Sequence, residues 1–255
     1  MITNIIILGC GSSIGVPRID GYWGNCKKTK KNIRTRSSMF IQKGDSNILI
    51  DTSPDLKQQL LKNKIKKVDH VLFTHEHADQ THGINELRPF FWISKKKIDI
   101  YGDMKTIKSL KKQFPYCFTK NKGYPPFLKS NVIKSNLVLG VKKEKIEFKC
   151  IKVRHGKIDC LGYIFQKVAY LSDCNGFYNN TIKDFRNLDI LILDCLKFNK
   201  HPTHFNLKEA VKISKYLKAK KTILTNLHHD LDYKFLLNNL PSNVIPAYDG
   251  LKLTI

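Results

Sequence analysis

The chain has 255 residues, of which 42% are hydrophobic and 10% aromatic, so it can form a substantial apolar core. This composition excludes an intrinsically disordered protein, and no apolar run is long enough to span a bilayer. The formal net charge is +24, but six of the 45 basic residues are arginines, so the charge indicates solvated lysine more than bidentate phosphate recognition.

The cysteines and the amino terminus indicate the compartment. The seven cysteines are scattered and include no Cys-x-x-Cys pair. The first residues read as a buried strand and lack the basic region and small-residue cleavage site of a signal peptide. An odd number of cysteines without a signal peptide predicts free thiols in a reducing cytoplasm. We therefore expect a cytoplasmic protein without a membrane partner.

Short apolar runs recur along the chain and are typical of buried strands. In chain order they predict strands at Ile5–Leu8, Asn47–Ile50, Val71–Phe73, Ile98–Tyr101, Ile146–Val153, Tyr163–Phe165, Ala169–Leu171, Ile190–Leu193, Thr222–Leu224 and Leu251–Ile255. Periodicity and helix-start residues predict helices between some of them, at Pro54–Asn63, Lys105–Gln113 and Leu207–Leu217. With no repeat or low-complexity linker, one α/β domain covering residues 1–255 is the simplest organisation.

An irregular aromatic and basic segment covers residues 114–127. Loops of this length inside a compact domain are often functional. Three interpretations stay open for it: a packed surface insertion, a wall of the substrate site, or a contact between two copies in a homodimer.

A cluster of histidines and acids directly follows the apolar run Val71–Phe73. It contains His75, His77 and His82, together with Glu76 and Asp79. Neutral imidazoles and carboxylates are the ligands of zinc, iron and manganese in hydrolases. Because His75 and His77 are two residues apart, they share a face only in an extended segment or a loop, which suits the end of a strand.

Further polar side chains follow other predicted strands or precede a helix. They are His155, Asp173, Asp194, His204 and His228. In α/β folds, side chains beyond the strand ends converge to form the active site. Their repeated occurrence at such positions predicts a metal-dependent hydrolase.

The chain thus resembles the metallo-β-lactamase superfamily, and within it the branch of the phosphoribosyl cyclic phosphate phosphodiesterase, which is related to ribonuclease Z. The resemblance is carried by the order of the residues above and by Leu8–Pro17, Leu49–Asp51, His204–Leu207 and Leu240–Gly250. It implies an αββα sandwich. It also implies that His75, His77 and His155 bind a first metal ion, that Asp173 bridges, that Asp79 binds a second ion, and that His204, alongside Asp79, is catalytic.

Two departures from that pattern concern the second ion. The histidines that the resemblance predicts there are replaced by Gln80 and Asn226, yet His82 and His228 lie two residues after each of them. One interpretation is a coordinated shift, with His228 and His82 as ligands; the alternative is one ion or a weak second site. The related phosphodiesterase also has a cysteine-rich structural zinc site. Here only Cys26 is present, so we expect no structural zinc.

The resemblance implies metal-assisted hydrolysis of a small anionic, cyclic phosphodiester with two divalent ions, zinc or manganese, or iron. Asp51 and Asp194 are candidates for orienting histidines or for capping. The alternatives are a ribonuclease Z-like nuclease acting on RNA, a non-catalytic metal-binding or nucleic-acid-binding protein, a cofactor-biosynthesis hydrolase and a thioesterase.

Overall fold

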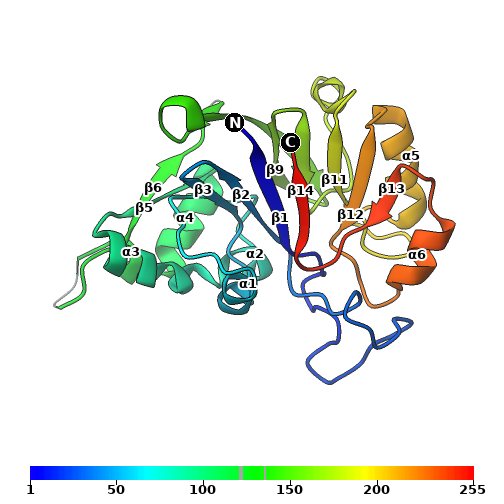
Figure 1. The fold of residues 1–255 in the computed structure, drawn as a ribbon, viewed down its shortest axis with the longest axis horizontal. Helices are drawn as coiled ribbons and strands as arrows, with labels where there is room; N and C mark the ends of the chain where they lie inside the picture. Colours follow the sequence, from blue (N-terminus) through cyan, green and yellow to red (C-terminus); the bar gives the residue numbers. More distant parts are fainter. Residues whose placement is uncertain (121–122, 135) are drawn as a thin grey trace.

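The computed structural model of the chain describes residues 1–120, 123–134 and 136–255. Two seven-stranded sheets lie face to face in it (Figure 1). The first has the order β14-β1-β2-β3-β4-β5-β6, with β1 Thr3–Gly9, β2 Ser38–Lys43, β3 Ser46–Ile50, β4 His70–Leu72, β5 Ile98–Gly102, β6 Leu128–Val132 and β14 Leu251–Thr254.

The second sheet has the order β13-β12-β11-β10-β9-β8-β7. Its strands are β7 Leu137–Leu139, β8 Ile146–His155, β9 Ile158–Phe165, β10 Val168–Leu171, β11 Ile190–Asp194, β12 Lys221–Thr225 and β13 Val244–Pro246. Strands β10 to β13 are parallel to one another, whereas β7 to β10 are antiparallel.

Helices cover the outer face of each sheet (Figure 1). Beside the first sheet lie α1 Leu56–Lys62, α2 Ala78–Thr81, α3 Arg88–Ser94 and α4 Met104–Gln113. Beside the second lie α5 Leu207–Leu217 and α6 Tyr233–Asn239. Single turns of 3₁₀ helix are η1 Ile84–Leu87, η2 Pro115–Cys117, η3 Lys142–Glu144 and η4 Ile182–Phe185. This arrangement confirms the predicted αββα sandwich.

Side chains that point alternately to the two faces of each strand form the apolar layers of the sandwich. Ile48 and Ile50 of β3 pack between the sheets with Ile192 of β11. The residues between them in sequence point the other way: Leu49 packs under the helices of the first sheet, and Leu191 under those of the second. Successive side chains of a strand face opposite sides, so fully buried strands need apolar residues at every position. This explains why they read as continuous apolar runs.

The ten predicted strands are all present, but four strands and three α-helices among the described residues were not predicted. Strand β6 is half exposed and reads Leu-Lys-Ser-Asn-Val, which has no apolar run. The helix predicted at Pro54–Asn63 begins later, at Leu56, with Asp55 as N-cap. Helix α5 begins as predicted, because the Asn206 side chain accepts a hydrogen bond from the Glu209 backbone N–H in a capping box.

The aromatic segment 114–127 packs beside α3, as far as the described residues show; 121–122 lie outside them. Cys117 and Phe127 are buried. The Arg88 guanidinium lies 5.8 Å from the ring centre of Tyr116 and 5.5 Å from that of Phe127. These contacts favour a packed insertion. Among the described residues, no helix is long and apolar enough to cross a membrane.

Parallel strands deliver polar residues to one edge of the fold. Leu171, Leu193 and Leu224 are register partners on β10, β11 and β12, so the residues after them emerge side by side. In the first sheet β3 and β4 are likewise parallel, and Ile50 is paired with Leu72. The loops that carry the predicted site residues therefore start from neighbouring strand ends.

Candidate metal centre

Three histidines from two distant segments converge at this edge. His75 Nε2 lies 2.9 Å from His77 Nδ1. The His155 ring centre is 5.2 Å from that of His75 and 5.3 Å from that of His77. One nitrogen of each ring falls within 4.8 Å of the others. Two nitrogens bound to a tetrahedral zinc ion are roughly 3.4 Å apart, so small movements suffice to form a three-nitrogen ligand set.

Hydrogen bonds set the tautomer of His75. Asp51 accepts from the Thr74 backbone N–H at 2.8 Å and from the Thr74 hydroxyl at 2.9 Å. The Thr74 hydroxyl has therefore used its proton, and it can only accept from His75 Nδ1, 3.0 Å away. The proton of neutral His75 sits on Nδ1 and Nε2 keeps its lone pair, as a metal ligand requires.

His155 is fixed in a similar way from the other sheet. Its Nδ1 lies 2.8 Å from the Thr203 backbone carbonyl, which can only accept. Burial lowers the pKa of His155 to about 4 and that of His75 well below its ordinary value. Both rings are therefore neutral near pH 7, which is the form that binds a metal ion.

Asp173, Asp194 and His204 form a second group beside the three histidines. His204 Nδ1 lies 2.8 Å from Asp194 and 4.0 Å from Asp173. Burial opposes the charged form of His204, but the Asp194 and Asp173 carboxylates outweigh it and raise its pKa to about 9. Burial also raises the pKa of Asp173, to about 7. The group can hold a proton at His204 next to the histidine cluster.

Gln80 and Asn226 both act as hydrogen-bond donors. Gln80 Nε2 lies 3.2 Å from Asp173 and 3.4 Å from Asp79. Asn226 Nδ2 donates to Asp194 Oδ1 at 3.1 Å. The three histidines thus fit one metal ion, and Asp173 lies in the adjoining group with His155 and His204. The second position is lined by amide N–H groups.

His82 and His228 lie in different surroundings. His82 is exposed, and its ring packs edge-on against Phe114 at 5.4 Å. His228 lines the cavity described next, but its Nδ1 is 3.1 Å from Asp230 and its ring lies against His229 at 3.6 Å. Among the described residues, no compact group of three ligands joins either one with Asp79 and Asp173.

A cavity of about 320 Å³ opens over the cluster. It is lined by Ser12, Ser13, Ile14, His77, Asp79, His155, Asp173, Leu196, Lys197, His201, Thr203, His204, Asn226 and His228. No role was predicted from the sequence for Ser12, Ser13, Lys197 or His201. The two serines, which lie between Gly11 and Gly15 after the first strand, could have indicated from the sequence that this segment lines the cavity. Lys197 could not, because nothing in the sequence distinguishes it from the many other lysines.

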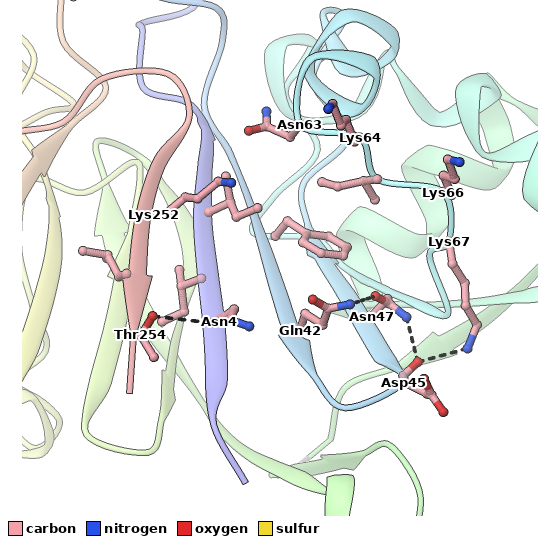
Figure 2. A pocket seen from close by; sticks show the side chains of 15 residues that line it. Asn4, Gln42, Asp45, Asn47, Asn63, Lys64, Lys66, Lys67, Lys252 and Thr254 are labelled. Atoms are coloured by element: carbon pink, nitrogen blue, oxygen red, sulfur yellow. Dashed lines mark hydrogen bonds between the residues drawn. The ribbon is translucent and has the colours of Figure 1, made fainter.

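A larger cavity of about 600 Å³ lies elsewhere, between β14, β1, β2 and the loop after α1 (Figure 2). Lys64, Lys66, Lys67 and Lys252 surround it. Among its described lining residues there is no histidine, and Asp45 is the one acid. Its described lining residues do not include a convergent set of acids, bases or metal ligands, so the smaller cavity is the candidate active site.

Comparisons with known proteins agree with this geometry. A family model described as a beta-lactamase superfamily domain matches residues 46–228. The crystal structure of a diphosphatase from the PhnP family is 33% identical with a TM-score of 0.90, covering 100% of this chain and 98% of that one. The short form of human tRNase Z has a TM-score of 0.70 at 18% identity over 98% of both chains, which shows the fold alone.

One curated relative is longer than this chain. An octanoyltransferase of Porphyromonas gingivalis (strain ATCC BAA-308 / W83) is 31% identical over 256 residues, which covers 98% of this chain and 51% of the relative. The chain therefore spans about half the length of that relative.

Proposed function

Because the chain belongs to the metallo-β-lactamase superfamily, whose fold implies divalent metal ions, we propose that it is a metal-dependent phosphodiesterase acting on a small, cyclic phosphate ester. The observation that carries the proposal is the convergence of His77 with neutral His75 and His155, beside Asp173 and an Asp194-bound His204. We propose that the span 1–255 forms one hydrolase unit.

The side chains divide the work as follows. His75, His77 and His155, together with Asp173, would hold the ion, zinc or manganese. Such an ion lowers the pKa of a bound water and polarises a phosphoryl oxygen. His204 keeps its Nδ1 on Asp194, which leaves Nε2 to donate a proton to the leaving oxygen.

The cavity supports a small anionic substrate. Its volume of about 320 Å³ lies at the lower end of the range for small-molecule sites. Lys197 and the hydroxyls of Ser12 and Ser13 line it and can attract and hydrogen-bond phosphate oxygens. A relative named diphosphatase makes a phosphoric anhydride the nearest competing substrate class.

The test is a hydrolysis panel with protein stripped of metal and reloaded with zinc or manganese. The panel contains bis(p-nitrophenyl) phosphate, ribose cyclic phosphate, a 2′,3′-cyclic nucleotide, a diphosphate, precursor tRNA, a lactam and, because one relative is named octanoyltransferase, an octanoyl thioester. We expect turnover of the small phosphate esters that depends on added metal. Cleavage of the thioester or lactam without any phosphate ester would refute the proposal.

His77→Ala tests the metal position directly. This variant should lose at least one equivalent of metal together with turnover, because the ligands converge only in the folded protein. His82→Ala is the matched control: it removes an exposed histidine from the same loop and should keep both. Full metal content and normal turnover in His77→Ala would show that the ion binds elsewhere.

A nuclease is the second candidate, favoured by the net charge of +24. A nucleic-acid enzyme that makes many phosphate contacts loses affinity as a steep power of the salt concentration. Strongly salt-dependent binding of precursor tRNA without small-ester activity would favour the nuclease. Modest salt sensitivity with small-ester turnover would favour the phosphodiesterase.

A further inference from the structure

Gln80 is a fully buried amide placed beside two carboxylates of the cavity. Its Nε2 lies 3.2 Å from Asp173 Oδ2 and 3.4 Å from Asp79 Oδ2, and an amide nitrogen carries two protons, one for each acid. Turning the amide over would place its Oε1 against both carboxylates. Since Oε1 accepts no hydrogen bond from any described residue, the two acids decide the orientation.

Asn226 has a comparable arrangement beside Asp194. Its backbone is in the left-handed region, with φ of 60°, which asparagine adopts more readily than most residues. Its Nδ2 donates to Asp194 Oδ1, so this amide also presents its N–H side within the group. Asn226 thereby holds the carboxylate that in turn holds His204.

A second cation between Asp79 and Asp173 would need further acceptors. Amide N–H groups carry partial positive charge and cannot ligate a cation. His228 does not supply the missing ligand, because it lies against His229 and Asp230. The second position implied by the resemblance therefore does not fit an ion in this chain.

We propose that the chain binds a single divalent ion at His75, His77, His155 and Asp173, and that Gln80 takes the place of a second ion by holding Asp79 and Asp173 with its amide. Gln80 is then a positioning residue: it neutralises part of the acid pair and orients Asp173 toward the ion. The inference rests on the proposed function only in taking the three histidines and Asp173 as the metal site.

Metal stoichiometry tests the inference without any substrate. The full-length protein is stripped with a chelator, titrated separately with zinc, manganese and magnesium, and analysed for bound metal by mass spectrometry. We expect one equivalent of zinc or manganese for the wild type. A Gln80→His/Asn226→His double variant replaces both amides with ligands and should bind two equivalents.

Gln80→Met supplies the second measurement, because methionine has nearly the same shape but no N–H. The single ion should bind about 10- to 100-fold more weakly, the usual effect of losing a partner that orients a ligand. The matched control is Gln113→Met, at an exposed position of α4, which should bind like the wild type.

The outcomes separate the two proposals. Two equivalents of any of the three metals in the wild type would overturn the inference, since Gln80 Oε1 would then face an ion, while the proposed function would stand. If the double variant bound only one equivalent of metal, or if Gln80→Met kept the metal affinity of the wild type, Gln80 would not be the positioning residue that replaces the second ion. One equivalent in the wild type, with no phosphate ester cleaved, would sink the substrate assignment and leave the inference intact.

Discussion

Asp51→Asn should weaken metal binding although Asp51 touches no metal ligand directly. In the wild type, the Asp51 carboxylate accepts from the Thr74 hydroxyl, which in turn accepts from His75 Nδ1. Burial raises the pKa of Asp51, but both hydrogen bonds from Thr74 favour its ionised form. An asparagine amide facing the hydroxyl would reverse this relay: the hydroxyl would accept from Asn and donate to His75 Nδ1.

The reversal places the imidazole proton on the nitrogen that has to bind the ion. Restoring the correct tautomer costs binding energy, and the loss of such a partner typically weakens metal affinity by about 10- to 100-fold. This corresponds to about 1.4–2.7 kcal/mol at 1.36 kcal/mol per factor of ten. The substitution should cause no backbone strain, because Asp51 has φ of 61° and asparagine tolerates this region well.

The assay is a competition titration of zinc against a chromophoric chelator, with the fold monitored by circular dichroism. Asp159→Asn, a half-buried aspartate at the start of β9, is the matched control. Thr74→Val should reproduce the loss, since it removes the same relay. Wild-type affinity in Asp51→Asn with an intact fold would refute the assignment of the relay.

Three further predictions follow from individual side chains. His204→Ala should keep its metal but lose rate on the order of 10²–10⁴-fold if His204 is the general acid; unchanged turnover would make it a bystander. Arg34→Met should lower the free energy of unfolding, measured in urea, by about 2–5 kcal/mol, because the buried guanidinium donates to the His228 and Leu231 carbonyls. Arg18→Met, at an exposed position, is the control and should change the free energy of unfolding little. Burial lowers the pKa of His70 in the folded protein, so the unfolded chain takes up the proton at a higher pH and the free energy of unfolding falls as the pH drops below about 6.5. His70→Gln should lessen that fall between pH 7.5 and 5.5. An equal fall in both proteins would contradict this prediction.

The sequence by itself determined the layers of this protein and the loop that carries His75 and His77. Continuous apolar runs predict strands buried on both faces, and these runs became the inner strands of both sheets. The spacing of His75 and His77 predicts a loop after a strand, and the structure places them there with their ring nitrogens 2.9 Å apart. Both features depend on residues that are close together in the sequence, so the local sequence pattern is sufficient to predict them.

Tertiary structure alone decided the contacts around that loop. Gln80 and Asp173 are 93 residues apart, and their hydrogen bond arises because two sheets bring their strand ends together. The spacing that suggested a linked shift of His82 and His228 is local, whereas their surroundings are set by Phe114 and Asp230. A short polar side chain carries no sequence signal for its distant partner, so the donor role of Gln80 emerges only when the chain is folded.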